Sequence, residues 1–442
     1  MPRKSDDRMK PSCNLSTYAQ LFRNRTLMML WSGGIISLVG DIFFNIAIVW
    51  AVYSHSQSML QSSLVQVVWH VNRLLMGFVA GTVADRYNRK FIMVSTNVLA
   101  STIIGLLAVV VWKWDNPPVV VTLCFVFLLN GITTFMTPAQ SSVIPEVVGP
   151  KLLADATGTY SILSRVFYIV GSSVAGIFIS FYGVLSAIIV NACSFLAAAL
   201  FILPLQLPTN IKSDQEAVKK PSFFREMRNG WQEVTKIPIL KTIILLGMLI
   251  NVASFMGPLL PGLVDQQLNA GAAALGSIEA AAVVGAILAG LFAGSLERKI
   301  GAGRVMIVGL CIVGLSVLGI AMSTWLPLTL VLFTIRMLGM TMTNIAMGTA
   351  IQLVISQEFR GRAWGISSSV AVIAIPISSL IGGYAADFFG AAPLYMVGGI
   401  WFLCCASFIG VKKEIRTLRL HTIYESHAKK EMVAQAGITS SQ

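Results

Sequence analysis

Long apolar runs alternate with short polar stretches along most of the chain. Each run holds about 20 residues, the length that an α-helix needs to cross the hydrocarbon core of a bilayer. The first run is longer than the apolar core of a cleaved signal peptide, so we expect it to remain as a helix. The pattern predicts an all-α membrane protein with twelve transmembrane helices, at roughly 27–53, 60–82, 91–112, 118–138, 156–180, 184–204, 242–261, 273–295, 305–323, 326–347, 363–384 and 391–411.

The longest polar interruption divides these helices into two sets of six. Its second part, from Phe223 to Val234, places apolar side chains at near-helical spacing. That spacing is typical of an amphipathic helix on a membrane surface, whereas the first part fits a flexible linker. The sequence therefore predicts five regions: an N-terminal segment (1–26), a six-helix half (27–205), a linker (206–241), a second six-helix half (242–411) and a C-terminal tail (412–442).

Composition agrees with a membrane protein. Hydrophobic residues make up 55% of the chain and charged residues only 12%, whereas a soluble domain carries about 25% charged residues. The net charge of +13 would by itself suit a nucleic-acid-binding protein. However, lysine and arginine gather in the termini and the even-numbered loops, while the odd-numbered loops hold only Lys113. By the positive-inside rule, we expect a multi-pass protein of the cell membrane with both termini in the cytoplasm and no nucleic-acid partner.

A short basic loop joins the second and third predicted helices. It contains Gly81, Asp85, Arg86, Arg89 and Lys90 in the pattern Gly-x-x-x-Asp-Arg-x-x-Arg-Lys. Glycine lets two helices approach closely, the carboxylate can interact with a neighbouring helix N-terminus or a cation, and the cations hold the loop in the cytoplasm. An ordinary positive-inside turn would explain the cations but neither the glycine nor the aspartate. We therefore expect a conformational gate here.

The loop recurs weakly in the second half of the chain. At an offset of 212 residues, Asp85 corresponds to Glu297, which Arg298 follows. The same offset relates Glu146 to Glu358 in a different loop. A shared offset in two separate loops indicates two halves related by duplication. The sequence thus adds Glu297 and Arg298 to the predicted gate.

These features together resemble the major facilitator superfamily, and within it the branch of macrolide and other drug exporters and the enterobactin exporter. The resemblance implies two pseudo-symmetric six-helix halves, transport by alternating access and a monomeric protein. The motifs that carry the branch resemblance are Leu30-Trp31 and Gly40-Asp41 in the first helix, Thr137-Pro138-Ala139 and Ile144-Pro145-Glu146 after the fourth, and Arg360-Gly361-Arg362 with Gly365 before the eleventh.

The chain also departs from this family. Many members carry an arginine in helix 4 that is tied to proton coupling, but here helix 4 offers Asn130 and the arginine is Arg336 in helix 10. The helix 5 motif Gly-Pro-x-x-Gly-Gly appears only between Gly171 and Gly176, without its proline. If protons drive transport, other residues must bind them.

Asp41 is the acid placed nearest to the middle of a predicted helix. Ionisable side chains at membrane depth cost several kcal/mol and indicate functional sites. A carboxyl group there can change its protonation as a cavity hydrates and dries. With the intramembrane cations Arg73 and Arg165 it forms the candidate proton-coupling set. The alternative is a static pair between Asp41 and one of these arginines.

A further set of polar residues predicts the substrate cavity. Its members are Asn45, His70, Asn130, Glu279 and Arg336. Glu279 falls near the outer end of its helix, where it can meet water. A surplus of arginine over acid would suit an anionic or carboxylate-bearing substrate. Arginine bound to helix carbonyls or lipid phosphates is the alternative.

The sequence predicts no cofactor, no metal site and no enzymatic activity. It holds no phosphate-binding loop of the Gly-x-x-x-x-Gly-Lys-Ser/Thr type, so ATP is not expected to drive transport. Its six cysteines lack zinc-ligand spacing. A membrane-embedded enzyme or a receptor would need a catalytic cluster or an added domain, which the sequence does not offer.

The sequence therefore predicts a secondary active transporter in the lipid bilayer. We expect a proton-driven exporter of an amphipathic small molecule, such as an antibiotic or another drug. The alternatives are an exporter of a siderophore or other anionic metabolite, and an importer on the same fold.

Overall fold

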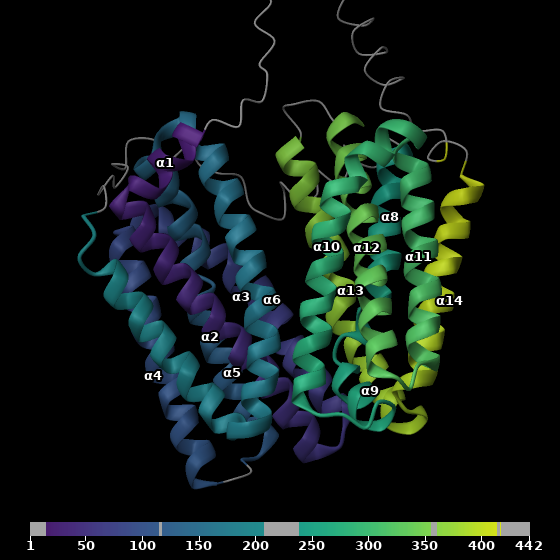
Figure 1. The fold of residues 1–442 in the computed structure, drawn as a ribbon, viewed down its shortest axis with the longest axis horizontal. Helices are drawn as coiled ribbons and strands as arrows, with labels where there is room; N and C mark the ends of the chain where they lie inside the picture. The colour runs from purple at the N-terminus through teal and green to yellow at the C-terminus, as the bar shows by residue number, and fades with distance from the viewer. Residues whose placement is uncertain (1–14, 115–116, 207–237, 355–359, 413–415, 417–442) are drawn as a thin grey trace, which may run out of the picture.

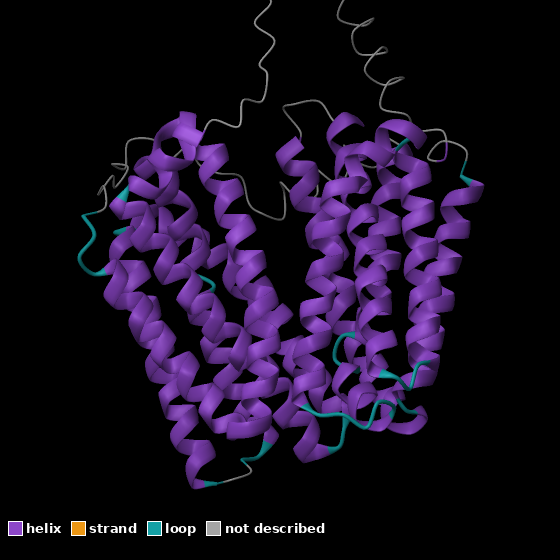
Figure 2. Cartoon of the chain, in the orientation of Figure 1, coloured by secondary structure: helices purple, strands orange, loops and turns teal. Residues whose placement is uncertain are grey.

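The computed structural model describes most of the chain. The predicted amphipathic surface helix falls outside the described residues, and every regular element within them is helical (Figure 2). The backbone alone is described for residues 15–17, Phe78, Asp85, Pro238 and the described residues between 352 and 373. The described ranges are 15–114, 117–206, 238–354, 360–412 and 416.

Polar caps mark where several of the helices before the linker begin. The Asn24 side chain accepts a hydrogen bond from the backbone N–H of Leu27, and the Ser58 side chain accepts one from Gln61. Such caps satisfy N–H groups that a helix leaves unpaired at its first turn. The helices described before the linker are α1 (Leu15–Arg23), α2 (Arg25–Ser56), α3 (Met59–Arg86), α4 (Arg89–Lys113), α5 (Val119–Thr133) and α6 (Met136–Ile202).

The long element α6 is not one straight helix. Gly149 has φ 72° and Gly183 has φ 78°, values in the left-handed region that only glycine adopts at little cost. The two glycines divide α6 into three helical stretches, so this part of the chain can turn back on itself.

The first helix after the linker differs from the expected pattern. The predicted helix at 242–261 is observed as α8, a short 3-10 helix and then α9, with a break after Met256. The helices described after the linker are α8 (Pro238–Val252), η2 (Ala253–Met256), α9 (Leu260–Gln266), α10 (Ala272–Ile300), α11 (Ala302–Met322), α12 (Leu326–Val354), α13 (Arg360–Phe389) and α14 (Ala391–Val411).

The helices have the length and composition of a membrane protein. In the described residues, eight helical segments are long and apolar enough to cross a bilayer. The longest of them, Val119–Ile202, spans 84 residues, several times the ~20 residues that one crossing needs. The expected multi-pass helical protein is thus confirmed.

Helices α1–α6 lie on one side of the bundle and α8–α14 on the other (Figure 1). We call these groups the first part and the second part. The basic end is where Tyr87 and Asn88 connect α3 to α4, and the opposite end is where Gln57 and Ser58 connect α2 to α3. The two parts diverge toward the basic end, at the top of Figure 1, and approach each other toward the opposite end.

Small residues bring the two parts together near the opposite end. A Cβ atom added to Gly276 of α10 would lie 2.2 Å from the Ser172 carbonyl oxygen of α6. A Cβ atom added to Gly383 of α13 would lie 2.2 Å from the Ser63 Oγ atom of α3. Close contact of this kind between membrane helices requires glycine at the crossing point.

Candidate functional site

A large polar pocket lies in the first part of the bundle, among α2, α3, α5 and the start of α6. Its volume is about 650 Å³. Three predicted cavity residues line it, Asn45, His70 and Asn130, and so does Arg73 from the predicted coupling set. Gly81 also lines it. This residue begins the basic segment 81–90 that the sequence predicts as a gate, which we call the signature loop, so the pocket extends toward the basic end. We call it the large pocket.

A second pocket continues from the first and is bordered by both parts of the bundle. It has a volume of about 260 Å³ and shares Asn45 and Trp69 with the large pocket. The first part supplies Tyr168 from α6, while the second part supplies Pro258 and Glu279. We call it the small pocket, and the two together the central cavity. A cavity between two groups of helices is where ligands of transport proteins bind.

Glu279 lies at the junction between the two parts. Its Oε2 atom accepts a hydrogen bond of 3.4 Å from the Tyr168 hydroxyl of α6. The Arg336 guanidinium of α12 is close enough for its charge to act on Glu279. Arg336 also lies 5.0 Å from the centre of the Phe333 ring. Glu279 therefore faces the central cavity, although its place in the sequence suggested a helix end exposed to water.

Asp41 lies in a different setting, inside the first part. Its carboxyl group neighbours Asn191 of α6. The preceding residue, Gly40, packs so tightly on α6 that an added Cβ atom would lie 1.9 Å from the Ser194 Oγ atom. No hydrogen bond or ion pair joins Asp41 to Arg73 or Arg165, all three of which the structure describes. The predicted coupling set is not brought together in this conformation.

Two predicted arginines lie outside the lining of the central cavity. Arg165 is an exposed residue of α6. Arg336 lies near Glu279 but lines neither pocket. Of the predicted substrate-cavity residues, the central cavity thus gathers Asn45, His70, Asn130 and Glu279.

An acidic side chain bridges the two parts at the opposite end. Asp387, near the end of α13, accepts hydrogen bonds from the Ser58 hydroxyl at 2.7 Å and from the backbone N–H of Met59 at 2.5 Å. It also accepts a longer one, of 3.4 Å, from the Leu60 N–H. These are the free N–H groups at the start of α3, so the second part supplies a carboxylate that caps a helix of the first part.

A second bond crosses between the parts at the same end. The Tyr53 hydroxyl of α2 donates to the Asp265 carboxylate of α9 at 3.2 Å. Nearby, Gly262 of α9 packs against the Met59 side chain, whose Cε atom would lie 2.5 Å from an added Cβ. Asp265 and Asp387 are set at helix ends in the sequence, but nothing in the sequence pairs them with Tyr53 and the start of α3.

The signature loop is mostly helical: residues 81–86 end α3, Arg89 begins α4, and only Tyr87 and Asn88 connect the two helices. The Asn88 side chain accepts hydrogen bonds from the N–H groups of Lys90 and Phe91 and so begins α4. Arg89 forms an ion pair with Glu146 and donates a hydrogen bond to the Ser142 carbonyl at 3.3 Å. This pair joins two motifs that the sequence presents separately. The Asp85 side chain lies outside the described atoms, and its gating role stays a prediction.

The corresponding acid in the second part is Glu297, which is 4% exposed. Its Oε2 atom accepts a hydrogen bond of 3.4 Å from the Thr349 hydroxyl of α12. Its Oε1 atom is buried without a hydrogen-bond partner among the described residues. The neighbouring Arg298 is exposed and donates to the Ser295 hydroxyl at 3.3 Å.

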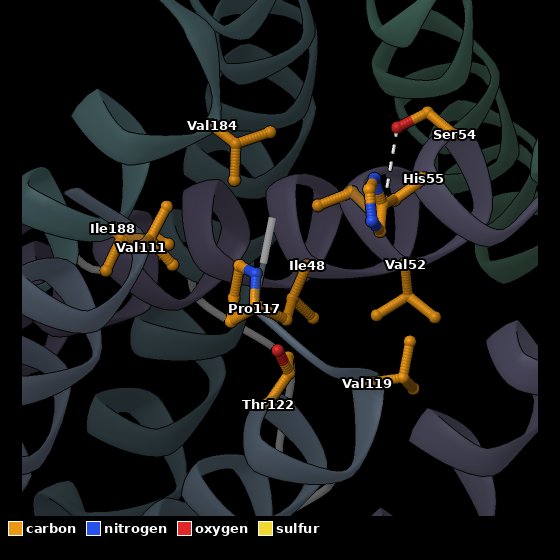
Figure 3. Close-up of a pocket in the computed structure, with 11 residues that line it drawn as sticks. Ile48, Val52, Ser54, His55, Val111, Pro117, Val119, Thr122, Val184 and Ile188 are labelled. Atoms are coloured by element: carbon orange, nitrogen blue, oxygen red, sulfur yellow. Dashed lines mark hydrogen bonds between the residues drawn. The ribbon is translucent and has the colours of Figure 1, made fainter. Parts of the chain in front are cut away.

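A third pocket lies at the opposite end and differs in chemistry from the central cavity. It has a volume of about 290 Å³ among α2, α4, α5 and α6. Figure 3 shows aliphatic side chains such as Ile48, Val52 and Val119 around it. Its lining shares no residue with the central cavity and holds no aspartate, glutamate, lysine or arginine. Its polar side chains are Ser54, His55 and Thr122, and it has no counterpart of Arg73 or Glu279.

The fold and the cavity together define a membrane transport protein. The whole bundle matches a known family: residues 15–437 fit the family described as transmembrane secretion effectors, in the major facilitator superfamily. The chain belongs to this family, and the resemblance inferred from its motifs is confirmed.

Relatives and solved structures agree with this assignment. The chain is 23% identical over 398 residues to macrolide efflux protein A of Streptococcus pyogenes, a match that covers 88% of this chain and 96% of that protein. It is 24% identical over 374 residues to the multidrug efflux pump Tap of Mycolicibacterium fortuitum, with 82% and 89% covered.

Among solved structures, the nucleoside transporter NupG aligns with a TM-score of 0.73 at 10% identity, covering 87% of this chain and 98% of that one. A bacterial homologue of the lysosomal transporter Spinster, in an inward-facing and unoccupied conformation, aligns with a TM-score of 0.64 at 16% identity. That match covers 89% of this chain and 96% of the homologue. At such identities these structures support the fold alone.

Proposed function

We propose that this protein is a proton-driven exporter of an amphipathic small molecule that works by alternating access. The observation that carries the proposal is the central cavity, which extends toward the basic end and is bordered at the opposite end by bonds between the two parts. A cavity accessible from one side, between two groups of helices that can rock, is what alternating access requires. The efflux relatives favour drugs, macrolides among them, as cargo.

The proposed architecture has twelve crossings in two pseudo-symmetric six-helix halves. The segment Val119–Ile202 supplies three crossings when it is divided near Gly149 and Gly183. The helices α3 and α13 supply one each, in addition to the other apolar segments. The halves would correspond to residues 27–205 and 242–411.

Orientation follows from charge. The signature loop carries Arg86, Arg89 and Lys90 at the basic end, and basic loops remain in the cytoplasm. The conformation described here would then accept substrate from the cytoplasm while the outer side is closed. That is the loading state of an exporter, and an importer would release its cargo from the same state.

A second candidate cargo is an anionic metabolite, such as a siderophore. The large pocket contains Arg73 and His70, while its described lining holds no acidic side chain. An unpaired guanidinium in such a pocket suits carboxylate or phosphate groups, which it binds through two parallel hydrogen bonds.

The test is transport in energised inverted membrane vesicles, together with drug susceptibility of an efflux-deficient bacterium that expresses the chain. We expect expression to raise the inhibitory concentration of erythromycin or of other compounds in a drug panel. Vesicles should accumulate the same compound only while a proton gradient is present. Secreted siderophores and organic acids are assayed in parallel.

The matched control is the Arg73→Ala variant at equal expression. Loss of anion export with retained drug export would separate the two candidate cargoes. If vesicles that contain folded protein accumulate neither drugs nor anions under a proton gradient, the proposed function is wrong. Proton-dependent uptake into intact cells would instead show an importer.

A further inference from the structure

Glu279 is an acidic residue of the second part that is bonded to the first. It lines the small pocket and accepts the hydrogen bond from Tyr168. The other charged or titratable groups near Glu279 are Arg336 of α12 and Tyr395 of α14. The Tyr395 hydroxyl already donates to the Met256 carbonyl at 2.8 Å. Of the two phenols, only the Tyr168 hydroxyl donates a hydrogen bond to Glu279.

The bond between Tyr168 and Glu279 depends on how the two parts are arranged. It joins α6 to α10, the same helices that meet at Gly276 and Ser172 near the opposite end. If that end opens, the two helices separate and the bond breaks. A hydrogen bond donated to a carboxylate favours its ionised form. Glu279 would thus hold a proton more readily when the opposite end is open than when it is closed.

We infer that the ionisation of Glu279 is coupled to closure of the opposite end, and that Tyr168 transmits this closure to the carboxylate. The inference rests on the proposed function and deepens it. A proton would bind the Glu279 carboxylate from outside while the opposite end is open. It would leave toward the cytoplasm when the end closes and Tyr168 returns. Inward movement of the proton would then drive outward movement of the substrate.

Asp41 provides the natural comparison. It lies on α2 beside Asn191 of α6, so both neighbours belong to the first part. When the two parts rock as rigid bodies, contacts inside one part persist, whereas contacts between parts change. The surroundings of Asp41 should therefore differ less between the two states than those of Glu279. The matched control for Tyr168→Phe is Tyr395→Phe. It also removes a buried phenol hydroxyl near Glu279, but the hydrogen bond of this hydroxyl to the Met256 carbonyl stays within the second part.

The experiment needs no identified substrate. Spin labels are placed at Gln57→Cys and Asn269→Cys, two exposed positions at the opposite end on different parts. The full chain has its six native cysteines replaced and is reconstituted in lipid nanodiscs. The distance between the labels is measured by pulsed electron paramagnetic resonance from about pH 5 to about pH 8.

We expect the long-distance population of the unsubstituted chain to grow as the pH falls. Glu279→Gln should keep this population high at every pH, because the neutral side chain mimics the protonated acid. Tyr168→Phe should flatten the pH response, whereas a purely structural defect would shift the distances equally at all pH values. If Glu279→Gln does not fold, Tyr168→Phe alone tests the inference. Tyr395→Phe should titrate like the unsubstituted chain.

The inference is overturned if Glu279→Gln or Tyr168→Phe titrates unchanged, if the unsubstituted chain shows no pH response, or if Tyr395→Phe flattens that response as Tyr168→Phe does. These label distances are measured without substrate, so they do not depend on whether vesicles transport any compound. Proton-driven export that persists in Glu279→Gln vesicles would contradict the inference and leave the proposed function standing. Absence of export by the unsubstituted chain would contradict the proposed function itself.

Discussion

The two ends of this bundle are held by contacts of different kinds. At the opposite end, Asp387 and Asp265 of the second part accept hydrogen bonds from the first part. At the basic end, Arg89 pairs with Glu146 inside the first part. The Arg89–Glu146 pair at the basic end thus stabilises one part alone, whereas the hydrogen bonds of Asp387 and Asp265 at the opposite end join the two.

This difference separates two tasks that acidic side chains near helix ends can perform. A bond between the parts must break when they rock apart, so its free energy adds to the preference for one conformation. A bond inside one part persists in both conformations and adds to the stability of that part. Substitutions at the two ends should therefore change different measured quantities.

The largest effect is expected at the crossing of α6 and α10. In Gly276→Ala, the new Cβ atom would lie 2.2 Å from the Ser172 carbonyl oxygen and 3.0 Å from the Gly176 backbone. Backbone cannot yield as a flexible side chain can, so the closed state should lose about 1–3 kcal/mol. The distance between labels at positions 57 and 269 should lengthen. The control is Gly290→Ala in the same helix, where nothing lies within 4 Å; equal distances in the two variants would contradict the packing argument.

Removal of the carboxylate that caps α3 should act in the same sense. Asp387→Ala leaves the Met59 N–H and the Ser58 hydroxyl without their acceptor, which should cost the closed state about 1–3 kcal/mol. The same label pair should report opening, and proton-driven uptake by inverted vesicles should fall. Asp155→Ala, which removes an exposed acid at the basic end, should change neither. An Asp387→Ala variant with normal distances would show that the cap does not hold the end closed.

A smaller shift is expected from Tyr53→Phe. The change removes one hydroxyl, and with it the 3.2 Å hydrogen bond to Asp265, at about 0.5–1.5 kcal/mol. Combining Tyr53→Phe with Asp265→Asn gives a double-mutant cycle. The free energy of opening is calculated for each variant from its populations of short and long label distances. The changes caused by the two substitutions should be less than additive, because both disrupt the same bond. Full additivity would mean that the pair does not act as a unit.

The smallest effect on conformation is expected at the basic end. In Arg89→Ala the ion pair with Glu146 is lost, but both side chains lie in the first part and are 17% and 25% exposed. We expect about 1 kcal/mol or less of stability to be lost, seen as a slightly lower thermal unfolding temperature. The distance between the labels at the opposite end should stay unchanged. A clear change there would mean that the Arg89 pair also couples the two parts.

Much of the fold can be predicted from the sequence, because each membrane helix requires a long apolar run. The run expected at 27–53 is observed as Arg25–Ser56, and the run expected at 91–112 as Arg89–Lys113. The break after Met256 was not predicted, because the sequence is apolar on both sides of it. The helical stretch from Met136 to Gly149 was expected only to residue 138, because Gln140, Pro145 and Glu146 interrupt the apolar run without ending the helix.

The candidate site was only partly readable. Polar residues inside apolar runs are conspicuous, and the central cavity gathers Asn45, His70, Asn130 and Glu279. Which of them face one another depends on helix rotation and on contacts far apart in sequence. The bond between Tyr168 and Glu279 spans 111 positions. No local pattern specifies such a pairing, and the roles of these residues stay predictions.

Alternating access requires that the two ends open and close in turn. Two label pairs in the same protein test this: Gln57 with Asn269 at the opposite end, and Lys151 with Lys299, two exposed residues outside the predicted gate, at the basic end. In Gly276→Ala, relative to Gly290→Ala, the first distance should lengthen while the second shortens. If the first pair separates and the second keeps its distance or lengthens as well, the two ends are not coupled and alternating access about the central cavity is contradicted.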